Sequence, residues 1–202
     1  MRPFSGLFQM QFTFLQTLHF VTPLKSDSNI GTLVIRYTYY TGQTRGYLCM
    51  PRPEVMHHFI TGENIAIITT RQIRNKWEPF VTKHICGHKS CARYDINTVF
   101  PLYLYPNGDM PESLFDYEDG RRPNLASDFI EEFSKRLRLE FIPDGKGDLK
   151  KTFGPEDVFN YMYAVFHSPT YRRRYAEFLK IDFSALASYL RFKTVPNSKF
   201  SG

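Results

Sequence analysis

The hydrophobic residues of this chain repeat with two different periods, and the change between them limits the folds open to it. Before residue 106, apolar and β-branched residues alternate or form short runs, as over residues 33–40 and 65–70. After residue 123 they recur every three or four positions, which is typical of amphipathic helices. The sequence therefore predicts an α+β fold, with a β-rich N-terminal half (a hairpin and a mixed sheet) followed by a helical C-terminal half.

Turn and capping residues place the expected elements. Strands are predicted over 33–40, returning as a hairpin arm at 46–49, and over 65–70, 80–82 and 99–105, with a helical turn at 54–60. Helices are predicted to begin at Ser127 as an N-cap, at Pro155, and after Ser168. We expect one stripe of the second helix and one of the third to face inward: Val158, Tyr161, Met162, Val165 and Phe166, and then Tyr171, Tyr175, Phe178 and Leu179.

These elements divide most of the chain into a β-rich part at 33–105, a linker at 106–123 that is rich in Pro, Gly and acidic residues, and a helical part at 124–183. Residues 1–32 are unassigned, although 9–14 alternate like a strand, and 184–202 form a tail.

Charge is distributed unevenly along the 202 residues. Residues 1–100 carry 11 Lys and Arg against 5 Asp and Glu, whereas residues 101–202 carry 15 of each, so the net charge of +6 belongs to the first half. Such an excess attracts anions such as phosphate, although a merely soluble basic surface has the same charge. Three cysteines and the lack of an 18-residue apolar run favour a cytoplasmic chain without a spanning helix.

Two stretches resemble metal sites, but each has a simpler interpretation. His84, Cys86, His88 and Cys91 lie within one short loop, whereas structural zinc sites draw ligands from two segments, so we expect lone loop residues. Asp144 and Asp148 with a following lysine mimic a nuclease motif without the apolar strands it requires, and a charged loop explains them.

No catalytic constellation is recognisable elsewhere in the sequence. His57 and His58 are expected to be solvated at a helix end. Nucleophile elbows and glycine-rich phosphate loops are missing from the sequence as well.

Basic and aromatic residues, Trp77 among them, are interleaved between 36 and 93, as in nucleic-acid-binding surfaces. The segment that begins at Arg71 follows a predicted buried strand, so its long hydrogen-bond donors should emerge at a sheet end. The predicted base or phosphate contacts are Arg71, Gln72, Arg74 and Lys76, and the predicted phosphate contacts are Arg45, Arg52, Lys83, Lys89 and Arg93. The run Arg172-Arg173-Arg174 is either a solvated helix face or a phosphate clamp.

Several motifs in order and spacing resemble one known family. They are RYTYYTG (36–42), PRPEVMHH (51–58), GENIAIITTRQ (62–72), FPLYLYP (100–106), PEDVFNY (155–161), HSPTYR (167–172) and YAEFLKIDF (175–183). The chain resembles the C-terminal specificity domain of type ISP restriction–modification enzymes and related adenine-specific DNA methyltransferases. The resemblance covers roughly residues 33–183; residues 1–30 match nothing known, and the sequence diverges after Phe183.

The resemblance implies a target-recognition domain that binds double-stranded DNA. It also implies a parent enzyme whose methyltransferase, translocase and nuclease parts use S-adenosylmethionine, ATP and Mg²⁺, while this chain holds no cofactor, no metal and no catalytic residue. We therefore expect a piece of a longer DNA adenine methyltransferase or restriction endonuclease. A self-contained metal-dependent hydrolase or nuclease and an inactive gene remnant stay open as alternatives.

Overall fold

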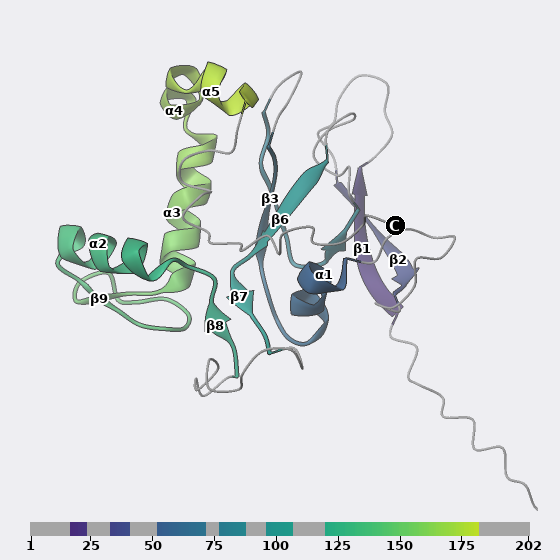
Figure 1. Ribbon diagram of the computed structural model, residues 1–202, viewed down its shortest axis with the longest axis horizontal. Coiled ribbons are helices and arrows are strands. Elements are labelled where there is room, and N and C mark those ends of the chain that lie inside the picture. The colour runs from purple at the N-terminus through teal and green to yellow at the C-terminus, as the bar shows by residue number, and fades with distance from the viewer. Residues whose placement is uncertain are drawn as a thin grey trace, which may run out of the picture.

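The computed structural model describes residues 17–23, 33–40, 52–71, 77–87, 96–106 and 120–181. Strands occupy most of the first half and helices most of the second, so the predicted α+β class is confirmed (Figure 1). In chain order the elements are β1 (Thr17–Pro23), β2 (Leu33–Tyr39), α1 (Pro53–Ile60), β3 (Ala66–Thr70), β4 (Phe80–Thr82), β5 (Ile85–Cys86), β6 (Asn97–Pro101), β7 (Tyr103–Leu104), β8 (Arg122–Pro123), α2 (Ser127–Leu137), β9 (Glu140–Phe141), β10 (Thr152–Phe153), α3 (Pro155–His167), α4 (Pro169–Arg174) and α5 (Ala176–Ile181).

The centre of the fold is an antiparallel sheet in the order β4-β3-β6. All five residues of β3 are buried, as the continuous apolar run predicted. Ile67 lies opposite Val81 on β4 and Phe100 on β6. Because successive side chains of a strand point to opposite faces, Ile67 belongs to one hydrophobic cluster, and Ala66 and Ile68 belong to another.

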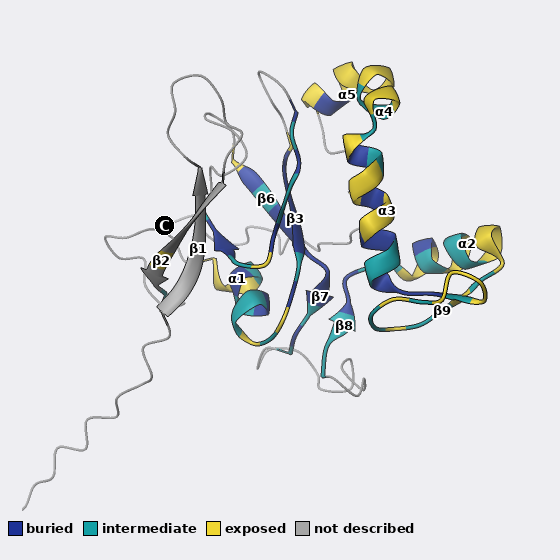
Figure 2. Cartoon of the chain, turned by 180° about the vertical axis from the view of Figure 1, so that it is seen from behind, coloured by how far each residue is buried: buried dark blue, intermediate teal, exposed yellow. Residues whose placement is uncertain are grey.

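Helices cover both faces of this sheet. On one side Met56 of α1 packs with Ala66 and Ile68, and on the other Met162 and Phe166 of α3 join the cluster around Ile67. Figure 1 shows α3 and α1 on opposite sides of β3, and Figure 2 shows α3 alternating between buried and exposed residues along its length. Because a different helix shields each face from water, the sheet forms the middle layer of the domain.

The predicted starts of the helices are right, but the inward faces differ in detail. Pro155 is the first residue of α3, and the Asp157 carboxylate accepts hydrogen bonds from the N–H groups of Gly147 (2.7 Å) and Gly154 (2.9 Å). The prediction that Tyr161 faces inward is wrong, because its side chain is 51% exposed and Phe159 is buried instead. The core side of α3 thus includes Phe159 in place of Tyr161, while Val158, Met162 and Phe166 are buried as expected.

The ends of α2 and α4 test the predicted capping residues. Ser127 does not cap α2: the N-cap position is Ala126, and the Ser127 hydroxyl bonds to Asp128 (3.2 Å). Ser168 does cap α4, accepting a hydrogen bond from the N–H of Tyr171 (3.4 Å). Tyr175 then separates α4 from α5, so a single helical stripe does not continue across it.

The interruption at Tyr175 explains a wrong prediction about the inward face of the last segment. Leu179 is buried, but Tyr175 is 40% exposed and Phe178 is 47% exposed. A break in the helix changes the direction of the side chains that follow it, so the i, i+4 spacing no longer selects one face.

The strands also differ from expectation in their partners. β2 pairs antiparallel with β1, which lies in the N-terminal segment that the sequence left unassigned. β1 also pairs with β5. The expected hairpin arm at 46–49 is outside the described residues. The predicted strand over 99–105 is divided, because β6 pairs with β3 and β7 pairs with β8. Leu102 joins the two parts, donating to the carbonyl of Ile65 (2.8 Å) and accepting from the N–H of Asn124 (2.8 Å).

Candidate DNA-binding surface

Arg71, the first of the predicted base or phosphate contacts, lies at one end of the central sheet. β3 stops at Thr70, which lies opposite Asn97 at the start of β6, and β4 starts at Phe80, opposite Ile68. Arg71 follows β3 directly and is exposed. The buried strand therefore holds the backbone of Arg71 on a rigid support at a position where the residue is exposed, as a DNA-contacting residue requires.

The predicted contact residues that the structure describes do not form one cluster. Lys83 is exposed and follows β4 at the opposite end of the sheet, since Thr82 lies opposite Ala66, the first residue of β3. Lys83 is therefore level with the residue before β3, and at about 3.3 Å per residue it lies roughly 20 Å from Arg71 along the strand direction. Arg52, just before α1, is exposed and forms an ion pair with the carboxylate of Glu54.

The other predicted contacts lie outside the described residues. They are Gln72, Arg74, Lys76, Arg45, Lys89 and Arg93. The predictions for these residues therefore stay predictions, and the geometry of the surface has to be built from Arg71 and its described neighbours.

The helical half reaches the same end of the sheet. A cavity of about 280 Å³ lies between the two halves, lined by Glu78, Pro79 and Phe80 on the sheet side and by Tyr163, His167 and Arg172 on the helix side. His167 forms a hydrogen bond with the backbone of Pro79, and burial lowers the pKa of its imidazole. The end of α3 and the start of α4 are thereby attached to the residues that lead into β4.

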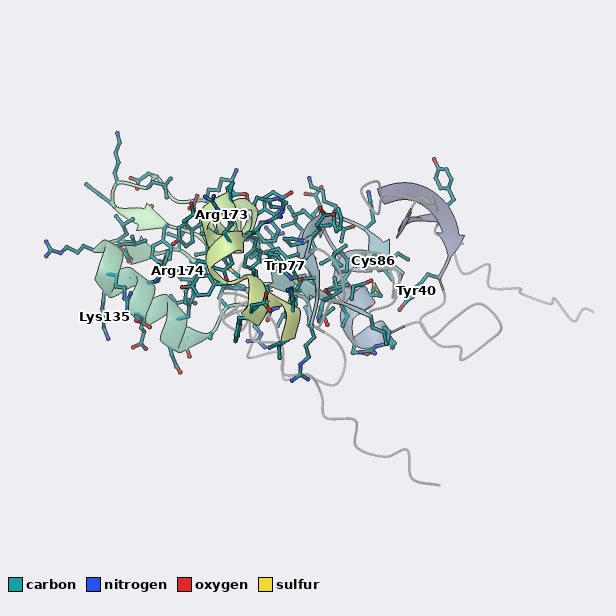
Figure 3. The ribbon with its side chains drawn as sticks, turned by 90° about the horizontal axis from the view of Figure 1, so that it is seen from above. Tyr40, Trp77, Cys86, Lys135, Arg173 and Arg174 are labelled. Atoms are coloured by element: carbon teal, nitrogen blue, oxygen red, sulfur yellow. The ribbon has the colours of Figure 1, made fainter. Side chains whose placement is uncertain are left out.

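The aromatic residues that the sequence interleaves with basic ones differ in their exposure. Trp77, expected among the interleaved surface residues, is only 6% exposed, and its ring packs edge-on against Phe166 with centroids 5.3 Å apart. Figure 3 shows Trp77 in the interior, between Cys86 and the arginines of α4. In contrast, Tyr37 on β2 is 74% exposed. A lone tryptophan is a large apolar residue, and its burial would have been the better expectation from composition.

Comparison with known proteins decides the family. A model of the type ISP C-terminal specificity domain matches residues 26–193. The chain belongs to this family. The match confirms the resemblance carried by the motifs, and it starts before and ends after the range 33–183 that those motifs indicated. No curated protein and no solved structure matched the chain.

Membership implies a DNA target-recognition role within a restriction–modification system. The exposed Arg71 at the end of a buried strand is compatible with that role. Among the described helices of the specificity domain, none is long and apolar enough to cross a membrane.

The cysteine and histidine loop of the specificity domain has structural contacts where it is described. Burial raises the pKa of the Cys86 thiol to about 12, so the sulfur stays protonated, and Asn97 lies within hydrogen-bonding distance of it (3.9 Å). The backbone of His84 bonds to the hydroxyl of Thr82. His88 and Cys91 are outside the described residues, and the described ones hold no group of three or more potential metal ligands.

The two acids of the nuclease-like motif act separately in the specificity domain. Asp144 accepts two hydrogen bonds from Nη2 of Arg121 (2.8 and 3.0 Å), and the guanidinium of Arg121 lies 3.9 Å from the centre of the Tyr103 ring. Asp148 accepts from the N–H groups of Lys150, Lys151 and Thr152, which lower its carboxyl pKa to about 2. Each carboxylate thus stabilises a loop of the fold.

The two histidines of α1 are not both solvated, which corrects the sequence interpretation. His58 is 6% exposed, and its Nδ1 accepts a hydrogen bond from the N–H of Tyr105 (3.1 Å). His57 is half-buried and donates from Nε2 to the carbonyl of Pro106 (2.8 Å). Burial, with the nearby His57 and Arg122 adding to it, lowers the pKa of His58 to about 4.

This burial predicts a pH dependence of stability. Between the unfolded value of 6.5 and the native value of about 4, the unfolded chain binds a proton at His58 that the native domain does not bind. The free energy of unfolding should therefore be highest, as far as His58 is concerned, above pH 6.5. It should fall by about 3 kcal/mol as the pH is lowered to 4. Urea unfolding at pH 7.5, 5.5 and 4.5 measures it, and His58→Gln should weaken the dependence. An unchanged dependence in His58→Gln would assign it to another group.

Proposed function

We propose that this chain binds duplex DNA and supplies sequence specificity to a type ISP restriction–modification enzyme that methylates adenine at N6. The observation that carries the proposal is the family match, with Arg71 at the end of a buried strand as the supporting geometry. The methyltransferase and translocase parts would be its protein partners. Base flipping and methyl transfer would take place in the methyltransferase part, because a target base has to leave the duplex before it can react.

The proposed contacts divide into two groups. Arg71, with Gln72, Arg74 and Lys76 after it, would reach base edges or phosphates, since Arg and Gln present paired donors that match bases in the major groove. Arg45, Arg52, Lys83, Lys89 and Arg93 would neutralise phosphates and place the domain on the duplex. At Arg52 the phosphate would replace the pair with Glu54.

The cofactors belong to the rest of the proposed enzyme. S-adenosylmethionine, ATP and Mg²⁺ would serve methyl transfer, translocation and cleavage there. In this chain the acids and the thiol that suggested metal chemistry already take part in the hydrogen bonds and ion pair of its own loops.

Substitution of Arg71 tests the function and the residue together. Because a base or phosphate contact by arginine contributes about 1–3 kcal/mol, Arg71→Ala should weaken binding to duplex DNA by roughly 5- to 150-fold. The measurement is a fluorescence anisotropy titration at 50 and 150 mM salt with the full chain. Arg136→Ala is the matched control, since Arg136 is an exposed helix arginine already paired with Glu132 (2.5 Å).

The results separate the two parts of the proposal. Binding by the wild-type chain, weakened by Arg71→Ala and not by Arg136→Ala, supports both. Equal affinity of Arg71→Ala and wild type would refute the role of Arg71 alone. If the wild-type chain binds no duplex even at 50 mM salt, independent DNA binding is wrong and the inactive remnant becomes the better description.

A further inference from the structure

Helix α4 carries basic side chains that no carboxylate of the described residues neutralises. On the described helices α2 and α5, Lys135, Arg136 and Lys180 each form an ion pair with a glutamate three or four residues away. On α4, neither Arg173 nor Arg174 pairs with a carboxylate in the described part of the chain, and both are exposed. The helical half is neutral in total, so this local excess cannot be seen in its net charge.

Arg172, the first arginine of the run, has a structural role instead. Its Nε donates to the carbonyl of Phe166 (2.6 Å) and its Nη2 donates to Nδ1 of His167 (3.1 Å). Its guanidinium also lies 5.9 Å from the centre of the buried Trp77 ring. These contacts attach α4 to the end of α3 and to the interior, so the two arginines that follow project from a fixed base.

The position of α4 places these arginines near the proposed DNA-binding end of the sheet. Arg172 and His167 line the same cavity as Glu78 and Phe80, and Phe80 starts β4 opposite Ile68, two residues before β3 ends. In Figure 1, α4 lies at the end of the molecule toward which β3 runs. Figure 3, which views the molecule from that end, labels Arg173 and Arg174 on α4.

We propose that Arg173 and Arg174 contact backbone phosphates of the DNA that this domain recognises, so that the helical half forms a second part of the DNA-binding surface. The inference rests on the proposed function. Two exposed guanidinium groups that pair with no carboxylate among the described residues have the charge and the donor geometry that phosphate requires. Tyr175 supports this arrangement, because the guanidinium of Arg174 lies 5.8 Å from its ring centre. Since Arg71 is at the same end, DNA phosphates fit this surface better than an acidic protein does.

The salt dependence of binding provides the test, because each phosphate contact releases counterions. The double variant Arg173→Gln/Arg174→Gln should lower the slope of log K against log salt by about 1.8, which makes the affinity loss between 50 and 200 mM salt about tenfold smaller than that of the wild type. The loss of affinity should be similar for specific and unrelated duplexes, as expected for phosphate contacts. Circular dichroism and thermal melting verify that each variant is folded.

Two further variants of the full chain sharpen the comparison. Lys135→Gln/Arg136→Gln removes the same charge from α2, where both residues pair with glutamates, and should leave the slope unchanged. Arg173→Lys/Arg174→Lys keeps the charge and should keep a slope close to that of the wild type.

The possible outcomes are distinct. A lower slope in the α4 glutamine variant alone supports the inference. Wild-type binding with an unchanged slope in that variant overturns it and leaves the proposed function intact, as would happen if α4 bound an acidic protein surface. Equal effects of the α2 and α4 variants would also overturn it, because net charge alone would then explain the change. A wild-type chain that binds no DNA overturns both proposals.

Discussion

Replacement of Phe166 by alanine should lower the free energy of unfolding by about 4 kcal/mol, because it leaves a cavity in the main hydrophobic cluster. Phe166 is fully buried in the last turns of α3 and packs against Trp77 and the partly buried Tyr171. The cluster joins the central sheet to the helical half, so the loss affects the contact between the two. For a domain of this size, the melting temperature should fall by roughly 10 °C, measured by circular dichroism.

Phe178→Ala is the matched control for this prediction. It removes the same atoms from a side chain on α5 that is 47% exposed, and it should change the free energy of unfolding by less than about 1 kcal/mol. Equal destabilisation by the two substitutions would contradict the assignment of Phe166 to the core between the halves.

Asn64→Ala should lower the free energy of unfolding by about 3 kcal/mol, because it removes hydrogen bonds and not because it removes packing contacts. The buried amide of Asn64 donates to the carbonyls of His58 (2.9 Å) and Tyr103 (2.7 Å). Its oxygen accepts from the N–H groups of Ile65 (2.9 Å) and Tyr103 (3.1 Å). One side chain thus connects α1, the start of β3 and β7, and its removal leaves backbone groups without partners away from water.

Urea unfolding of two more variants separates this network from a general effect of truncation. Asn64→Asp keeps the oxygen acceptors and loses both donors, so it should also destabilise the domain. Asn160→Ala, at an exposed position of α3, should have little effect or stabilise slightly, since alanine is the better helix former. A wild-type stability for Asn64→Ala would show that water replaces the amide at this site.

The local elements were largely predictable, because their signals are short-range. Apolar runs predicted β3 and β4, proline at the first helical turn predicted α3, and Ser168 predicted the start of α4. The errors arise where a predicted element is divided. Tyr175 separates α4 from α5 where spacing alone predicted one helix, and Leu102, which bonds to Ile65 and Asn124, separates β6 from β7. Neither event has a signature within its own segment.

The candidate site could be predicted only in its general nature. The motifs identified the family, and the buried strand before Arg71 indicated an exposed residue at its end, which the structure confirms. That Lys83 lies at the other end of the sheet depends on the register between β3 and β4, which the sequence pattern does not contain. The placement of α4 near the same end as Arg71 depends on contacts between residues about ninety positions apart, such as those of His167 with Pro79.

The sequence by itself determined the α+β class, most of the segments that become strands and helices, and the membership of the type ISP specificity family. These follow from hydrophobic period, capping residues and motif order, all of which are local or linear. Only the tertiary structure decided that His58 and Trp77 are buried, that Asp144 pairs with Arg121, and that the exposed arginines of α4 share an end of the molecule with Arg71. The physical reason is that burial and charge pairing depend on which surfaces exclude water together, and packing alone determines that.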